Sequence, residues 1–204
     1  MIFSSTLSKV IALAMVSTSL ASPLDLQPRG DRIVIGYRTV SKAEADSIRK
    51  AKTIVYDSKL SSGGKQNGEG VYLTSELGQW PPSHLDDEFC RVTADKDKVE
   101  KAKKAWIKQD VEWNEDAVAK AIKDLEDDWK AKQVLRLSKV KGKSYLQLVI
   151  PKDMVGHDLI VHHTRGDLDF EAECRPEAKW TQADHQNIDW NDGPFEKNVK
   201  GDKQ

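Results

Sequence analysis

Two cysteines, Cys90 and Cys174, are the feature that most constrains how this 204-residue chain can fold. In an oxidising compartment they have a single pairing, Cys90 with Cys174. Closing so long a loop would stabilise the fold by roughly 4–5 kcal/mol in the chain-entropy description, less any native strain. The alternatives are two free buried thiols or half of a zinc site. A lone pair of cysteines, however, lacks the CxxC spacing that is typical of zinc sites.

The first residues predict export into such an oxidising compartment. Lys9 supplies one positive charge, an apolar run covers residues 10–16, and small residues follow. Ser19-Leu20-Ala21 matches a signal-peptidase site with cleavage after Ala21, and the apolar run is too short to span a bilayer. No later stretch is apolar enough for a membrane span. We therefore expect residues 1–21 to be a signal peptide and the mature protein to be secreted, soluble and extracellular.

The mature chain of about 180 residues is long enough for one domain with a substantial core. Charged residues make up 32% of the sequence, but they nearly cancel to a net charge of -1. This balance argues against a nucleic-acid-binding protein that relies on bulk charge. We expect a flexible lead-in over residues 22–31, a single domain over 32–176, and a loosely ordered tail over 177–204. Trp180 or Trp190 would pin that tail.

The apolar pattern predicts an α+β domain. The expected strands cover residues 32–40, 71–75, 88–94, 134–137, 145–150, 159–162 and 168–174. Ser41 is a good helix N-cap with Glu44 as its capping-box partner, and that helix would end near residue 51. Further helices are expected over 95–106 and 114–129, with a short helical turn over 151–155. This order lacks the regular strand–helix–strand alternation of a doubly wound sheet.

Three short motifs suggest a ligand site. The glycine-rich stretch Gly68-Glu69-Gly70-Val71-Tyr72-Leu73-Thr74-Ser75 runs into a strand that ends in two hydroxyls. Gly36-Tyr37-Arg38 precedes it, and Glu171-Ala172-Glu173 follows it. In this order the motifs resemble the ADP-ribosyltransferase fold, and in particular secreted fungal proteins similar to the A subunit of heat-labile enterotoxin. The resemblance spans residues 33–174 and implies a split, mostly antiparallel sheet with flanking helices.

The resemblance also implies how NAD would be bound. Arg38 would offer a bidentate donor to the pyrophosphate of NAD. The strand that contains Thr74 and Ser75 would form one wall of the nicotinamide pocket, and one of these hydroxyls would orient a downstream glutamate. Tyr72 or Tyr56 would stack on the nicotinamide ring. Leu73 departs from the family pattern, because a serine is expected at its position.

The two glutamates are the predicted catalytic residues. Glu173 would stabilise the positive charge that develops on the ribose as the nicotinamide bond breaks, and Glu171 would help to activate the acceptor. Residues two apart in a strand share one face, so both carboxylates face a pocket or both face solvent. Asp167 and Asp169 make this hairpin locally acidic, which favours the solvent-facing interpretation.

The sequence thus predicts a secreted, toxin- or effector-like mono-ADP-ribosyltransferase that uses NAD to modify a host or competitor macromolecule in virulence. One alternative is a catalytically inactive secreted binding protein of the same fold, and another is a secreted NAD glycohydrolase. No nucleic-acid or membrane binding is evident. His157, His162 and His163 invite a metal site, but adjacent histidines point to opposite faces of a strand, and we expect no metal. Trp80, beside Pro81-Pro82, is the tryptophan that we expect to be exposed near a cleft.

Overall fold

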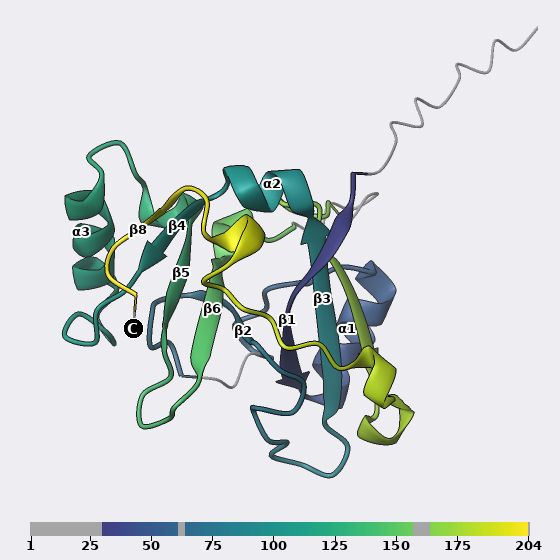
Figure 1. The fold of residues 1–204 in the computed structure, drawn as a ribbon. Helices are drawn as coiled ribbons and strands as arrows, with labels where there is room; N and C mark the ends of the chain where they lie inside the picture. Colours follow the sequence, from purple (N-terminus) through teal and green to yellow (C-terminus); the bar gives the residue numbers. More distant parts are fainter. Residues whose placement is uncertain (1–29, 61–63, 157–163, 204) are drawn as a thin grey trace, which may run out of the picture.

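The structure is a computed structural model that describes residues 30–60, 64–156 and 164–203. Within these residues eight strands form one sheet: β1 (Arg32–Val40), β2 (Gly70–Thr74), β3 (Glu88–Asp95), β4 (Lys103–Trp106), β5 (Val134–Lys139), β6 (Leu146–Pro151), β7 (Glu171–Arg175) and β8 (Val199–Lys200). Their order is β7-β3-β1-β2-β6-β5-β4-β8 (Figure 1). β4 pairs parallel with β5 and β8, and the other paired strands are antiparallel.

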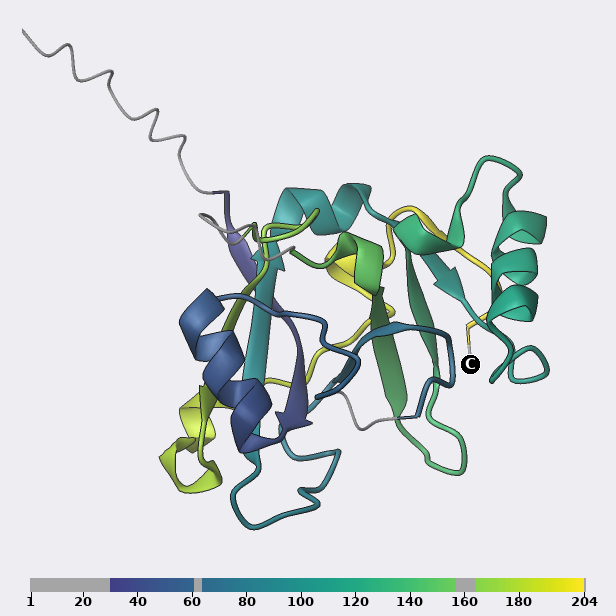
Figure 2. The ribbon, with the colours of Figure 1, turned by 180° about the vertical axis from the view of Figure 1, so that it is seen from behind.

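Helices lie at both ends of this sheet. The described α-helices are α1 (Lys42–Ala51), α2 (Lys96–Lys101) and α3 (Glu115–Leu125). Short 3-10 turns are η1 (Ala131–Gln133), η2 (Lys152–Met154), η3 (Glu177–Lys179), η4 (Gln182–Asp184) and η5 (Gly193–Phe195). Figure 2 shows α1 against the β1–β3 end of the sheet, and α3 lies beyond β4 at the other end. The predicted α+β class is confirmed, with a mixed sheet.

Local signals place α1. The Ser41 side chain accepts a hydrogen bond from the Glu44 backbone N–H at 3.3 Å, as expected of an N-cap. The helix ends where Lys52 adopts a left-handed conformation with φ of 56°. Its buried Ala45 and Ile48 pack on Cys90 and Cys174. Burial of this apolar stripe fixes α1 to one face of the β1–β3–β7 region.

The predicted disulfide Cys90–Cys174 is present. The two residues lie directly opposite each other in the antiparallel β3–β7 pair, with their Cα atoms 4.0 Å apart. Both side chains are buried beneath α1. The bridge therefore links the edge strand β7 to its neighbour within the sheet.

The C-terminal segment differs from the expected loosely ordered tail. The indole Nε1–H of Trp190 donates to the Ile35 carbonyl at 3.0 Å, and the Ile188 N–H donates to the Ser75 carbonyl at 3.0 Å. Trp190 and Phe195 lie in the main hydrophobic core, and β8 adds to the sheet beside β4. Figure 1 shows this yellow segment crossing the sheet. Trp190 anchors this segment, as predicted. The segment is nevertheless part of the domain and not a loosely ordered tail beyond residue 176, because the large aromatic side chains outweigh the polar composition around them.

A second correction concerns the helix expected over residues 95–106. α2 ends at Lys101, and residues 103–106 form β4. Ala105 and Trp106 are buried where β4 pairs in parallel with β5. The lysine-rich composition suggested a solvated helix, but long-range strand pairing prevails. β7 is also shorter than predicted and begins at Glu171.

Some predictions fall outside the described residues. These are the signal peptide (1–21), most of the lead-in, the strand over 159–162 and the histidines His157, His162 and His163. Among the residues that the structure does describe, no helix is both long enough and apolar enough to cross a bilayer.

Lys104 provides a pH test of the core. Its buried Nζ donates to the carbonyls of Val99 at 2.6 Å and Ala102 at 2.8 Å. Burial lowers the pKa of Lys104 from 10.5 to about 8, although Glu100 opposes this shift. Between these two pKa values the unfolded chain binds more protons than the folded chain, so stability rises with pH.

The free energy of unfolding should therefore increase by about 3 kcal/mol between neutral pH and the unfolded-state pKa of Lys104, at roughly 1.4 kcal/mol per pKa unit. Urea unfolding of the wild type and of Lys104→Met at both pH values measures this increase. Groups other than Lys104 titrate in both proteins, so their contribution cancels when the change in the variant is subtracted from the change in the wild type. An identical pH dependence in the two proteins would contradict the account.

Removing the disulfide tests the β3–β7 link. The double variant Cys90→Ala/Cys174→Ala should lose about 2–5 kcal/mol of unfolding free energy, as is common for native disulfides. Chemical denaturation of the oxidised wild type, the reduced wild type and the double variant measures the loss. Equal midpoints for all three would show that the bridge contributes nothing to stability.

Candidate functional site

Arg38 and Glu173 lie on opposite faces of the sheet. In the β1–β3–β7 register, Arg38 is opposite Cys90, which is opposite Cys174. One position along, Tyr37 is opposite Arg91, which is opposite Glu173. Directly paired residues share a face, and successive residues in a strand alternate. The predicted pyrophosphate donor and the predicted catalytic carboxylate are therefore separated by the sheet itself.

Arg38 points towards α1 and is paired within the fold. Its Nη2 lies 2.6 Å from Oε1 of Glu44, and the two side chains are only 10% and 6% exposed. Burial raises the pKa of Glu44 and lowers the pKa of Arg38, and in each case the charge of the partner opposes the shift. Nε of Arg38 is buried with no hydrogen-bond partner among the described residues. Ser41 thus caps α1 by accepting from the Glu44 backbone N–H, while the Glu44 carboxylate pairs with Arg38.

Glu173 belongs to a mixed-charge cluster on the opposite face. It accepts hydrogen bonds from Arg91 at 3.0 Å and from Arg175 at 2.5 Å. Both guanidinium groups lie over the ring of Trp180, at 5.6 Å and 4.8 Å from its centroid. Asp184 lies 3.6 Å from each arginine. The Glu173 carboxylate is 46% exposed, and its charge is balanced by its neighbours.

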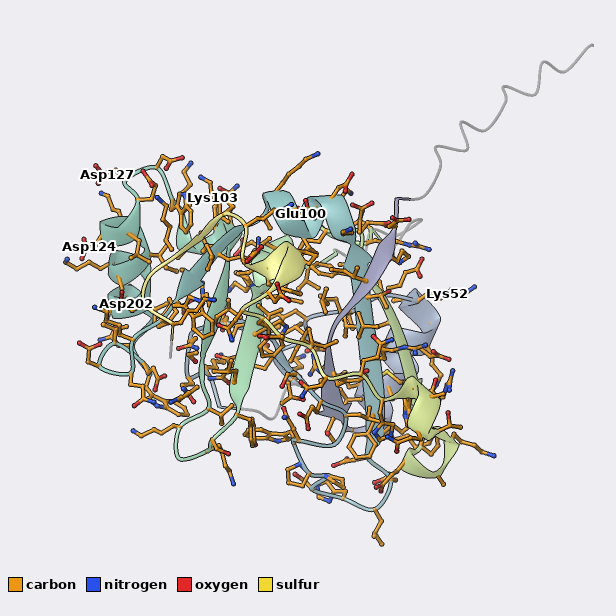
Figure 3. The ribbon with its side chains drawn as sticks, in the orientation of Figure 1. Lys52, Glu100, Lys103, Asp124, Asp127 and Asp202 are labelled. Atoms are coloured by element: carbon orange, nitrogen blue, oxygen red, sulfur yellow. A yellow bond between two sulfur atoms is a disulfide. The ribbon has the colours of Figure 1, made fainter. Side chains whose placement is uncertain are left out.

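Glu171 shares this face, as the strand period predicts. It forms ion pairs with Arg165 and with Nε of Arg32, the latter at 3.3 Å. The two glutamates border a shallow depression of about 420 Å³, together with Lys52, Arg91, Thr93, Arg165 and Ala172. Lys52 lies at the C-terminal end of α1 (Figure 3). Neither Arg38 nor the hydroxyls of Thr74 and Ser75 reach this depression.

The hydroxyls of the glycine-rich motif are engaged in local contacts. Thr74 is buried, and its Oγ1 lies 3.2 Å from the Tyr37 carbonyl and 3.1 Å from the Glu76 carbonyl. Ser75 donates to the side-chain oxygen of Gln79 at 3.2 Å. These hydroxyls secure the end of β2 and the turn that follows it.

Tyr72 fixes the glycine turn. Its hydroxyl donates to the Gly68 carbonyl at 2.7 Å and accepts from the Asn67 N–H at 2.9 Å. Burial raises the pKa of Tyr72. The Tyr72 hydroxyl is therefore anchored to the loop that precedes β2.

A buried polar network lies behind the same loop and was not predicted. Arg136 donates to the Asn67 carbonyl, and also to the Ala131 carbonyl at 3.1 Å. The Asn67 and Gln147 side chains both donate to Ser138 Oγ, at 2.7 Å and 3.0 Å. The available sequence signal was the alternation of Arg136 and Ser138 with apolar residues in β5, and the single polar residue Gln147 in β6. The network attaches residues 66–68 to the sheet.

Two further observations bear on ligands. The predicted exposure of Trp80 is confirmed, since it lies in the loop between β2 and β3 and is 41% exposed, but it does not line the depression beside Glu171 and Glu173. Leu85 of the same loop is fully exposed. Among the described residues, no group of three or more histidine, cysteine, aspartate or glutamate side chains is arranged to hold a metal ion.

The sequence model of a family described as of unknown function, DUF5910, matches residues 65–202, which is most of the chain. The chain belongs to this family. No curated protein and no solved structure matches it. The DUF5910 match includes the glycine-rich motif, the loop between β2 and β3, and the Glu171-Ala172-Glu173 strand. Arg38 lies before it.

The Arg38–Glu44 pair predicts an asymmetric response to mutation. Arg38→Met leaves a buried carboxylate without its partner, and the free energy of unfolding should fall by about 3–5 kcal/mol. Arg38→Met/Glu44→Leu removes both charges and should recover most of that loss. Urea unfolding of the three proteins measures the effect. A double variant no more stable than the single one would contradict the structural role of the pair.

Proposed function

We propose that this protein is a secreted binding protein, effector-like and without catalytic activity. The single observation that carries this proposal is the position of Arg38 and Glu173 on opposite faces of the sheet. An NAD-cleaving site needs one ligand to contact both a pyrophosphate donor and a carboxylate at the ribose. Here each of those side chains has its own partner of opposite charge.

Export is part of the proposal. It is supported by the N-terminal sequence pattern and by the Cys90–Cys174 disulfide, which is compatible with an oxidising compartment. A disulfide-stabilised domain that presents exposed apolar side chains is suited to binding a macromolecule outside the cell.

The alternative functions are the NAD-dependent ADP-ribosyltransferase and the NAD glycohydrolase. The order of the three sequence motifs and the α+β class support both activities. The same two observations support an ADP-ribosyltransferase-like architecture. Both would use Glu173 beside the ribose, with Glu171 nearby. The two activities differ only in whether water or a macromolecule accepts the ADP-ribose.

An NAD assay separates these functions. The mature, oxidised wild type, Glu173→Gln and Arg38→Lys are incubated with NAD, and nicotinamide release is followed by chromatography. We expect no release above the buffer rate in any of the three, and no heat of NAD binding by calorimetry. Release by the wild type that Glu173→Gln abolishes would overturn the proposal in favour of an enzyme. A known NAD glycohydrolase serves as the positive control.

A further inference from the structure

The loop that joins β2 to β3, residues 75–87, carries an exposed apolar surface. Trp80 is 41% exposed and Leu85 is fully exposed, and Trp113 is the only other large apolar side chain so exposed among the described residues. Figures 1 and 2 show this loop projecting beyond the sheet on the side of η3. Two such side chains in one loop, beside Pro81 and Pro82, are typical of a binding surface.

The loop is held in place although its apolar side chains face solvent. Thr39 Oγ1 donates to the Trp80 carbonyl. Oδ2 of Asp87 accepts hydrogen bonds from the backbone N–H groups of Ser83 at 2.7 Å and His84 at 3.0 Å. Because these contacts organise both halves of the loop, a partner would meet a preorganised surface.

A depression of about 610 Å³ lies beside Leu85. Pro82, Leu85, Phe89, Pro176 and Ala178 give it an apolar lining. It brings the 75–87 loop next to η3, which follows the disulfide-linked strand β7. An apolar side chain of a partner can therefore insert between the two segments.

Carboxylates surround this apolar surface. Asp86 and Glu177 line the depression and are exposed, and neither has an ion-pair partner among the described residues. Glu88 is also in the lining, but Arg49 holds it at 2.5 Å. Lys42 is the lysine of the lining, and it lies within 3.9 Å of both Asp46 and Glu88. Lys179 of η3 is exposed but does not line the depression, so the unpaired carboxylates of the lining, Asp86 and Glu177, make its charge negative.

We propose that the 75–87 loop and η3 bind a basic peptide segment of a partner protein that carries a bulky apolar side chain. This inference rests on the proposed binding function. The apolar side chain would fill the depression against Leu85. Trp80, exposed elsewhere in the same loop, would add a second apolar contact, since tryptophan is enriched among residues that dominate binding energy. Lysine or arginine side chains would pair with Asp86 and Glu177.

The charge also selects against other occupants. A second copy of this chain, docked through the same surface, would bring one acidic surface against another, so the carboxylates of Asp86 and Glu177 would face carboxylates. An anionic lipid surface would repel the same carboxylates. A basic segment of another protein satisfies both the apolar and the charged groups.

The test measures the affinity of the full mature protein for three sets of short synthetic peptides of equal length. One set is basic with a tryptophan or leucine, the second is basic without one, and the third is acidic with one. Fluorescence anisotropy at low and high salt gives the dissociation constants. We expect the first set to bind about tenfold or more tightly than the others, and its affinity to fall with added salt.

Variants locate the binding. Trp80→Ala/Leu85→Ser should weaken binding of the first set by about tenfold or more. Asp86→Asn/Glu177→Gln should weaken binding of the first set at low salt and reduce the salt dependence of that binding. If the loop variant does not fold, this double variant tests the same surface. Trp113→Ala is the matched control, because Trp113 is exposed but lies outside the loop. This variant should bind the first set with the affinity of the wild type. Unfolding midpoints confirm that each variant is folded.

Two results would overturn the inference: equal affinity for the three peptide sets, or variants that bind like the wild type. Self-association that the loop variant abolishes, without a peptide preference, would assign the surface to a second copy and also overturn it. These failures are distinct from failure of the proposed function, which only NAD turnover by the wild type would produce.

Discussion

The pairing of β3 with β7 is the constraint on which the candidate site depends. Cys90 and Cys174 lie directly opposite each other, and the bond between them fixes the register of the two strands. A slip of one residue would move every side chain of β7 to the other face of the sheet. With the register fixed, Glu173 must lie beside Arg91, while Cys174 faces α1 and shares that face with Arg38.

Three buried cations make their contacts within the fold. Arg38 pairs with Glu44, Lys104 donates to two carbonyls near the end of α2, and Arg136 donates to the loop before β2. Removing one partner from such a contact leaves a buried charge or carbonyl without a partner. The stability lost in this way exceeds the stability that an exposed ion pair contributes. The charges of these three cations are thus engaged within the fold. The exposed surface retains the Trp80 and Leu85 side chains and a few unpaired carboxylates.

Local signals in the sequence predicted local structure well. The β-branched run of β1, the Ser41 N-cap and the cysteine pair were confirmed, because each depends on neighbouring residues or on a single available pairing. β4 was mistaken for helix, and the C-terminal segment for loose chain, because their order comes from distant contacts: pairing with β5, and burial of Trp190. The predicted positions of Arg38 and Glu173 on one face were missed for the same reason. Motif order predicts neither strand register nor the face on which Arg38 lies.

Side-chain NMR of arginine tests the opposite-face arrangement most directly. The buried Nε–H of Arg38 should give a slowly exchanging signal in ¹⁵N-arginine spectra, assigned by its loss in Arg38→Lys. The structure predicts that excess NAD leaves this signal unchanged, because Glu44 and α1 occupy the space around the guanidinium. A shift of the Arg38 signal on adding NAD that is lost in Glu173→Gln would place both residues at one ligand and contradict the account.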